Sequence, residues 1–256
     1  MQSIEQLLTV VKQLRDPLTG CEWDRVQTFD SIKGNTLEES YEVLQAIEQK
    51  NFPELKTELG DLLFQILLYA QMAEEQQHFS FDDICNTLKQ KLISRHPHIF
   101  GEQKTAKINW EVLKQKERDQ KQQYSILDDI PQALPALMRA EKIQKRCASV
   151  GFDWQTLPPV IDKVKEEIDE VLAEINCDKQ VTEKIEEEVG DLLFSVVNLT
   201  RHLGFNAELT LNKASQKFER RFRQVENIIS KQGHKLNEVT LDEMEQAWQQ
   251  VKRNEP

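Results

Sequence analysis

The sequence predicts an all-α protein built from two copies of one helical unit. Charged residues make up 30% of the 256 residues, and only 8 Gly and 8 Pro interrupt the chain. This composition suits long solvated helices better than a turn-rich β protein. The string E-x-G-D-L-L-F occurs at residues 58–64 and again at 188–194. Further motifs surround both strings in the same order, which indicates a tandem duplication.

The flanking motifs define the two copies. Gly-x-x-Trp opens each copy, at 20–23 and 151–154, and E-E-x-x-E-V-L follows at 38–44 and 166–172. A Lys/Arg pair and then W-x-x-x-K close each copy, as Lys91, Arg95, Trp110 and Lys114 in the first and Lys217, Arg221, Trp248 and Lys252 in the second. We therefore expect an N-terminal helical-bundle domain over 1–122, a linker over 123–135 and a C-terminal domain over 136–256.

Helix boundaries follow from caps and breakers. Thr36 with Glu39 has the spacing of a capping box, which predicts a helix over 36–49. Asn51 precedes Pro53 and predicts the start of a helix over 53–77. In the second copy, prolines 158 and 159 open a helix that ends near 175, and the next helix starts near 182. Each copy is therefore expected to contain an antiparallel helical hairpin.

Paired acids dominate each predicted hairpin. Acids three residues apart share one face of a helix, and the midpoints between the pairs, residues 50 and 179, fall in the predicted turns. Groups equally far from the turn of an antiparallel hairpin come level. Four carboxylates should meet in each copy: Glu39, Glu42, Glu58 and Asp61 in the first, and Glu167, Glu170, Glu188 and Asp191 in the second.

The apolar run that follows the first acidic pair predicts an interface. LLFQILLYA, at 62–70, is apolar on nearly every side of a helix, and such a helix must be buried on every side. A unit of this size cannot cover it alone. We expect packing against another unit, in this chain or in a second chain.

A divalent cation resolves the repulsion among level carboxylates, because an isolated buried carboxylate is costly. Oxygen ligands favour hard ions, and Mg²⁺ commonly combines carboxylates with phosphate oxygens. A solvated acidic face is the plainer interpretation of one such pair. A di-iron bundle would need two E-x-x-H motifs, whereas the chain offers Glu75-x-x-His78 alone. His96 and His98 are expected to end a helix.

Charge and composition exclude some functions. The formal net charge is −11, which disfavours a nucleic-acid polymer as a partner. The four cysteines stand apart without a C-x-x-C pair, which is typical of reduced thiols. The apolar runs are too short and polar to span a membrane. We expect a cytoplasmic protein.

The ordered motifs resemble those of the MazG nucleoside triphosphate pyrophosphohydrolases, members of the all-α NTP pyrophosphatase superfamily, over essentially the whole chain. One acidic motif alone is less specific, since dimeric dUTPases and phosphoribosyl-ATP pyrophosphohydrolases are similar. The resemblance implies a homodimeric, Mg²⁺- or Mn²⁺-dependent enzyme. It would cleave nucleoside triphosphates between the α and β phosphates to monophosphate and pyrophosphate.

The resemblance also implies residue roles in the C-terminal copy. The metal ligands would be Glu167, Glu170, Glu188 and Asp191, and the first copy would hold a second site of this kind. The catalytic residues at the phosphates or the attacking water would be Glu166, Lys184 and Glu187. The nucleotide-binding residues would be Lys163, Lys217, Arg221, Trp248 and Lys252. From the residues alone, Lys217 and Arg221 also suit a solvated basic stripe, and Trp248 also suits a core anchor.

The two copies differ beside the acids. Lys184 and Glu187 of the second copy correspond to Glu54 and Thr57 of the first. An anion beside a triphosphate is unfavourable by about 1 kcal/mol or more, so we expect the C-terminal copy to be catalytic. Two alternatives stay open: a catalytically idle metal and nucleotide sensor that acts through a protein partner, and a narrower dCTP or dUTP hydrolase. The absence of an obvious base-reading set favours broad specificity.

Overall fold

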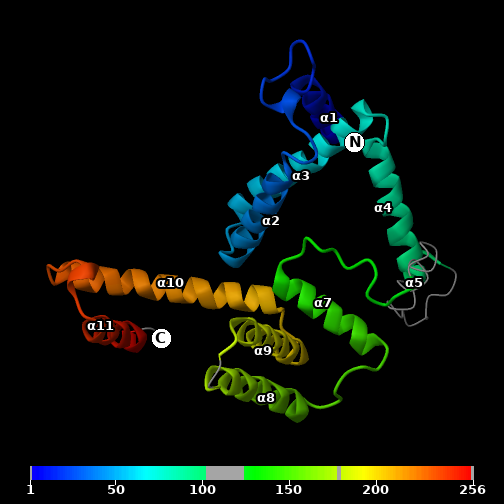
Figure 1. Ribbon diagram of the computed structural model, residues 1–256. Coiled ribbons are helices and arrows are strands. Elements are labelled where there is room, and N and C mark those ends of the chain that lie inside the picture. The colour runs from blue at the N-terminus through cyan, green and yellow to red at the C-terminus, as the bar shows by residue number, and fades with distance from the viewer. Residues whose placement is uncertain (1, 102–123, 178–179, 255–256) are drawn as a thin grey trace. The chain divides into compact units, whose positions relative to one another are not determined.

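The computed structural model describes residues 2–101, 124–177 and 180–254, and within these ranges the regular structure is entirely helical. This confirms the all-α prediction (Figure 1). The chain divides into two compact units, residues 1–110 and 111–256. The expected boundary at residue 122 falls among residues outside the described ranges and stays a prediction.

The N-terminal unit is built around an antiparallel helical hairpin. Its helices are α1 (Gln2–Leu14), the short 3-10 helix η1 (Asp24–Val26), α2 (Lys33–Glu48), α3 (Phe52–Glu75), α4 (Phe81–Arg95) and α5 (Pro97–Phe100). The α2–α3 pair forms the hairpin, and α1 and α4 pack against α3. His96 caps the end of α4, as expected.

An apolar core holds this unit together where α3 meets α1 and the start of α2. It consists of the buried side chains Val11, Ile32, Leu67, Leu68 and Met72. The run after the acidic motif is thus buried on one side. Ile66, in the same run, is 41% exposed. The unit therefore leaves one side of α3 uncovered, as expected from the apolar composition of this run.

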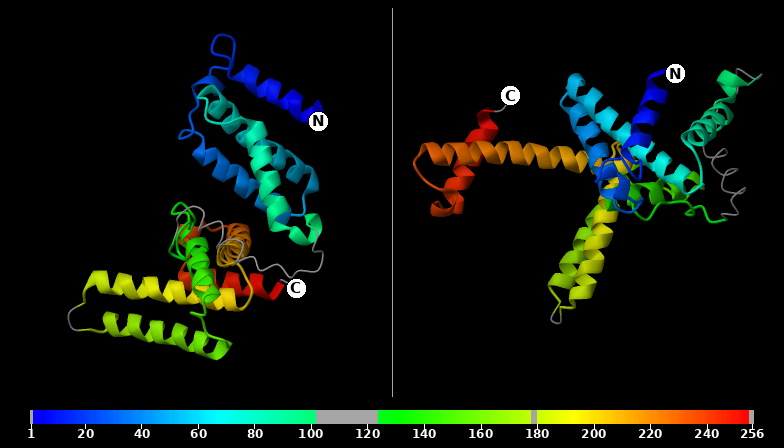
Figure 2. Two further views of the ribbon diagram at one scale, coloured as in Figure 1. Left: turned by 90° about the vertical axis from the view of Figure 1, so that its right-hand side faces the viewer. Right: turned by 90° about the horizontal axis from the view of Figure 1, so that it is seen from above.

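The C-terminal unit repeats the hairpin and adds a long arm. Its helices are α7 (Ala136–Ser149), α8 (Leu157–Ile175), α9 (Thr182–His202), α10 (Ala207–Lys231), the short η2 (Leu236–Glu238) and α11 (Leu241–Asn254). The α8–α9 pair forms the hairpin, with α7 packed against α9. The α10–α11 pair forms the arm, whose far end points away from the hairpin (Figure 2).

Most predicted helix boundaries hold to within two or three residues. Asn51 caps α3 by accepting a hydrogen bond from the backbone N–H of Glu54 at 3.3 Å, and prolines occupy the first turn of α8. Lys50, at the predicted midpoint of the first turn, adopts a left-handed φ of 54°. The second midpoint, residue 179, lies outside the described residues.

The capping box predicted at Thr36 is wrong. The backbone N–H of Thr36 already donates to the carbonyl of Ile32 at 3.2 Å, so α2 starts earlier, at Lys33. The Thr36 hydroxyl instead lies 2.9 Å from the Tyr69 hydroxyl on α3. Burial of Ile32 in the core favours an extra helical turn over a cap at Thr36.

None of the helices in the described part of the chain is both long and apolar enough to cross a membrane.

Candidate metal and nucleotide site

Three carboxylates of the C-terminal unit meet across the α8–α9 interface. Each of Glu167, Glu170 and Glu188 offers a ligand oxygen within 4.8 Å of the others. Glu167 and Glu170 come from α8 and Glu188 from α9, as the count from the turn predicted. Asp191, one turn beyond Glu188, lines a cavity together with Glu167. The hairpin therefore gathers three of the four expected acids in one cluster, and the charge of Asp191 acts on Glu188 from beside it.

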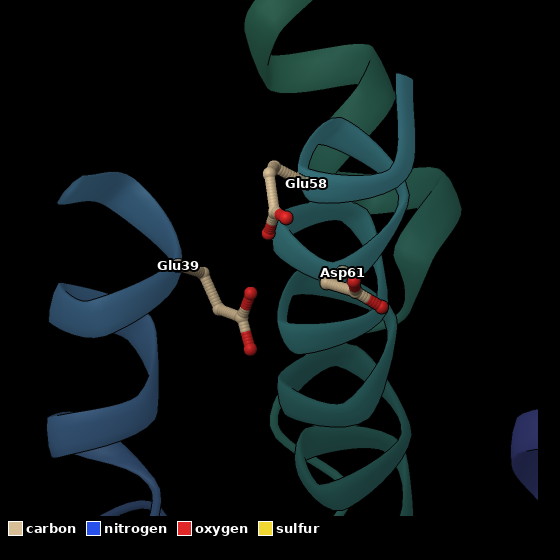
Figure 3. Close-up of side chains that lie close together, drawn as sticks. All are labelled: Glu39, Glu58 and Asp61. Atoms are coloured by element: carbon tan, nitrogen blue, oxygen red, sulfur yellow. The ribbon is translucent and has the colours of Figure 1, made fainter. Parts of the chain in front are cut away.

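The N-terminal unit forms a matching cluster from Glu39, Glu58 and Asp61, also within 4.8 Å of one another. Glu39 extends from α2 towards α3, which carries the other two (Figure 3). Burial raises the pKa of Glu39, and the charges of Asp61 and Glu42 raise it further. Beyond the effect of burial, the fourth expected acid, Glu42, is close enough for its charge to raise the pKa of Glu39 and of Glu58.

The acids of the C-terminal cluster repel one another, and both burial and this repulsion affect the pKa of Glu188. Partial burial raises the pKa of Glu188, followed by repulsion from Glu170 and Asp191. Lys163 offsets part of this charge, because its Nζ lies 2.8 Å from Oε1 of Glu166 and 2.7 Å from Oε1 of Glu167. These hydrogen bonds raise the pKa of Lys163, which keeps the ammonium charged.

The donor set suits a divalent cation. The Glu167 residue is only 4% exposed, and its Oε2 is buried without a hydrogen-bond partner. A buried carboxylate oxygen without a partner is costly, and a cation would satisfy it. The gathered ligands are all oxygens, which hard divalent ions prefer.

The di-iron alternative finds no support at Glu75. Arg15 donates two hydrogen bonds to the Glu75 carboxylate: its Nη2 donates to Oε2 at 2.7 Å, and its Nε donates to Oε1 at 2.9 Å. These contacts lower the pKa of Glu75 even though burial alone would raise it. Glu75 is therefore one half of an ion pair between α3 and the end of α1.

Two of the expected catalytic residues flank the cluster, and the third lies farther along the hairpin. Glu166 contacts the cluster through its shared partner Lys163, and the charge of Glu187 contributes to the raised pKa of Glu188. Lys184 is nearer the turn, with its Nζ 4.0 Å from Oε1 of Glu174. All three are exposed or at the surface of the hairpin, where a substrate can reach them.

The remaining expected nucleotide-binding residues lie on the α10–α11 arm. The Trp248 ring lies 5.0 Å from the Phe218 ring and 5.9 Å from the Arg221 guanidinium carbon. Trp248 also packs against the buried cluster of the arm, so within one chain it acts as a core anchor. Lys217 and Lys252 are exposed on α10 and α11. Trp110 and Lys114 of the first copy lie outside the described residues.

A cavity of about 700 Å³ opens beside the C-terminal acids, and motif analysis missed most of its walls. Helices α7, α8 and α9 and the Gly151–Trp154 segment line it. The repeated Gly-x-x-Trp was a signal for one wall. The polar residues on the other walls, Gln144, Asn198 and Arg201, lie outside the repeated motifs named above.

The family model for the MazG nucleotide pyrophosphohydrolase domain matches twice, at residues 27–100 and 155–226. The chain belongs to the MazG family. Both matches contain an α-helical hairpin with its acidic cluster. The two MazG domains therefore correspond to the two copies in the sequence.

Relatives match along nearly the whole chain. A nucleoside triphosphate pyrophosphohydrolase of Escherichia coli K12 is 56% identical over 260 residues, which cover 100% of this chain and 99% of the relative. A nucleoside triphosphate pyrophosphohydrolase/pyrophosphatase MazG of Thermotoga maritima is 40% identical over 249 residues, 97% of this chain and 95% of the relative. A nucleoside triphosphate pyrophosphohydrolase of Mycobacterium tuberculosis is 35% identical over 166 residues, 62% of this chain and 50% of the relative.

Proposed function

We propose that this chain is a Mg²⁺-dependent enzyme that hydrolyses nucleoside triphosphates to monophosphates and pyrophosphate, with broad base specificity. The observation that carries the proposal is the cluster of Glu167, Glu170 and Glu188, because its member Glu167 lines a cavity large enough for a nucleotide. Membership of the MazG family and the names of the full-length relatives support the same reaction.

The residues at the cluster match the needs of the reaction. A Mg²⁺ ion held by the four acids would neutralise charge on the phosphate oxygens. Lys163 adds a positive charge beside Glu167, where it would stabilise the charge of the bound phosphates. Glu166 or Glu187 would accept the proton of the water that attacks the α phosphorus, while pyrophosphate leaves with the electrons of the broken P–O bond. Substrate and water are thus converted to monophosphate, pyrophosphate and a proton.

Product analysis tests the reaction and the ion together. The protein is incubated with ATP after treatment with a chelator, and again after Mg²⁺ or Mn²⁺ is restored. We expect AMP and pyrophosphate only when the ion is present. ADP with orthophosphate would contradict cleavage at the α–β bond, and no product with any nucleotide would favour the sensor. A panel of eight ribo- and deoxyribonucleotides separates broad specificity from a dCTP or dUTP hydrolase.

We assign catalysis to the C-terminal copy because a position that lines its cavity is part of the apolar core in the N-terminal copy. At the offset that relates Asp61 to Asp191, the cavity residue Asn198 corresponds to Leu68. Leu68 is fully buried in the apolar core. The Asp191→Ala variant should lose turnover and Asp61→Ala should keep it. The reverse result would move catalysis to the N-terminal copy.

We further propose that a homodimer completes the site. The arm carries Lys217 and Arg221, but its far end points away from the α8–α9 hairpin, which carries the acids (Figure 2). Both the hairpin and the arm expose large apolar side chains: Ile168, Leu172, Leu193, Val196, Leu211 and Phe218. A second copy would cover these faces and bring its arm over the acids.

Mixed dimers test this arrangement. Glu167→Gln and Arg221→Ala are each expected to be inactive alone. The two variants are mixed under conditions that allow the dimers to exchange their chains. If the arm acts on the partner's acids, each mixed dimer contains one intact site and activity returns. If the arm acts within its own chain, every site keeps one defect and activity does not return. The mass of the wild-type protein in solution gives the oligomeric state independently.

A further inference from the structure

The cavity beside the C-terminal acids extends well beyond them. Along α8 its lining residues are Val160, Lys163 and Glu167, which share one face over seven residues, or about 10 Å of helix. Along α9 the lining runs from Asp191 to Arg201, ten residues or about 15 Å. Because α8 and α9 are antiparallel, Glu167 and Asp191 lie at one end, and Val160 and Arg201 at the other.

The end remote from the acids is closed by the segment before α8. Oδ1 of Asp153 accepts hydrogen bonds from Nη2 of Arg201 at 2.7 Å and from the Nε2 side of His202 at 2.9 Å. These contacts tie the segment to α9. The same carboxylate oxygen accepts from the backbone N–H of Trp154 at 3.0 Å. The aromatic side chains of Phe152 and Trp154 therefore line the end opposite to the acids.

The two ends differ in chemistry as the two ends of a nucleotide do. Carboxylates and an ammonium group lie at one end, whereas Phe152, Trp154 and Val160 lie at the other beside the Asp153–Arg201 ion pair. Trp154 is 43% exposed, so part of its side chain is accessible from the cavity that it lines. A planar heterocycle stacks favourably on an accessible indole ring.

One polar side chain in the lining between the two ends has an unused acceptor. Gln144, on α7, is 7% exposed and lines the cavity. Its Nε2 donates to the backbone carbonyl of Phe194 at 2.8 Å, which fixes the orientation of the amide. Its Oε1 is buried without a hydrogen-bond partner. An exocyclic amino group of adenine or cytosine is a donor that would satisfy this oxygen.

Resting on the proposed hydrolysis of nucleoside triphosphates, we infer that this cavity receives the nucleobase, with Trp154 as its stacking face and Gln144 as the acceptor for an exocyclic amino group. Both residues precede the second MazG match, which begins at residue 155. Base recognition is thus supplied by α7 and the segment after it, whereas the acids belong to the matched hairpin.

The first test separates base binding from phosphate binding. Trp154→Ala is compared with Trp23→Ala, which changes the tryptophan of the same motif in the first copy, 49% exposed. We expect Trp154→Ala to raise the KM for ATP about tenfold, since stacking on an aromatic ring is lost. Inorganic tripolyphosphate, which has no base, should inhibit both variants and the wild type with the same inhibition constant within about twofold. An unchanged KM for ATP in Trp154→Ala would place the base elsewhere.

The second test compares nucleotides in two pairs, ATP with ITP and CTP with UTP. Within each pair only the first base has an exocyclic amino group at the position tested. Gln144→Leu is compared with Gln13→Leu, the exposed glutamine at the corresponding position of the first copy. The ratio of kcat/KM for ATP over ITP, and for CTP over UTP, should fall about 3- to 10-fold in Gln144→Leu only, because one hydrogen bond is lost. A purely structural role would lower all four values equally and leave both ratios unchanged, which would overturn the role of Gln144.

The outcomes also separate this inference from the proposed function. If the wild type releases no pyrophosphate from any nucleotide, the proposed reaction fails. If the wild type is active but the Trp154 and Gln144 variants keep its base ratios and its KM, the reaction stands and the base pocket fails. If Trp154→Ala does not fold, Trp154→Leu is measured in the same assay, and circular dichroism confirms its helix content.

Discussion

Nζ of Lys163 lies 2.7 Å from Oε1 of Glu167, the most buried carboxylate of the C-terminal cluster. The two residues are four apart on α8 and face the cavity together. The lysine thus compensates one oxygen of Glu167, and the other oxygen is left without a partner. The free oxygen of Glu167 is therefore available to a metal ion, and the ammonium group of Lys163 beside the other oxygen is available to an anionic substrate.

Replacing Lys163 should impair the reaction more than folding. We expect Lys163→Met to lower kcat/KM for ATP about 10- to 100-fold, since a charge positioned at the phosphates is lost. Lys165→Met is the control, because Lys165 is exposed and pairs with Asp162 on the outside of α8. Steady-state kinetics at saturating Mg²⁺ measures both. Equal effects of the two substitutions would contradict a specific role for Lys163.

Replacing Glu188 should stabilise the metal-free protein. Its pKa is raised in the folded state by partial burial and then by neighbouring acids, so ionisation opposes folding above its ordinary pKa of 4.5. This penalty grows as the pH rises above 4.5 and is complete above the raised, folded pKa. Glu188→Gln should therefore raise the melting temperature in a chelator, while Mg²⁺ should stabilise the variant less than the wild type. Scanning calorimetry measures both, with exposed Glu186→Gln as control. A lower melting temperature without metal would contradict the repulsion.

The Asp153 contact predicts a pH-dependent contribution to stability. Burial alone would raise the pKa of Asp153, but the hydrogen bonds from Arg201 and His202 outweigh it and lower the pKa below its ordinary 3.8. The contribution is present above pH 3.8 and is lost as the pH falls through the lower, folded value. Asp153→Asn should cost about 1–2 kcal/mol at pH 7. Urea unfolding should show this difference shrinking below about pH 4, and a difference independent of pH would argue against the charge.

Trp248 should contribute to the stability of the arm as well as to any nucleotide contact. It packs on the core of α10 and α11 and on the ring of Phe218. Trp248→Ala should cost about 2–3 kcal/mol, less than a fully buried tryptophan, because the side chain is partly exposed. Urea unfolding measures the loss. Trp248→Phe should recover most of it, and no loss in the alanine variant would show that the arm does not depend on this ring.

Local rules in the sequence were enough for most of the fold. The cap at Asn51 and the prolines in the first turn of α8 gave helix starts that the structure confirms. The rule failed at Thr36, because burying Ile32 in the core extends α2 by one turn. A capping motif contributes only about 1 kcal/mol, and burial of an isoleucine contributes more.

The acids could be placed from the sequence because their positions depend only on helix period and distance from a turn. The same counting brought Glu167, Glu170 and Glu188 together across α8 and α9. Counting could not place Trp248, since a tryptophan can equally anchor an apolar core or stack on a nucleobase. Its contact with Phe218 depends on how α11 folds back on α10.

The sequence by itself thus determined the duplicated helical hairpins and the level carboxylates, which are repeated, local features with a fixed period. Tertiary structure alone decided the cavity, in which Gln144, Trp154 and Arg201 come together from α7, the segment after it and α9. The physical reason is that packing between helices selects which side chains share a space, and no periodic pattern encodes that choice.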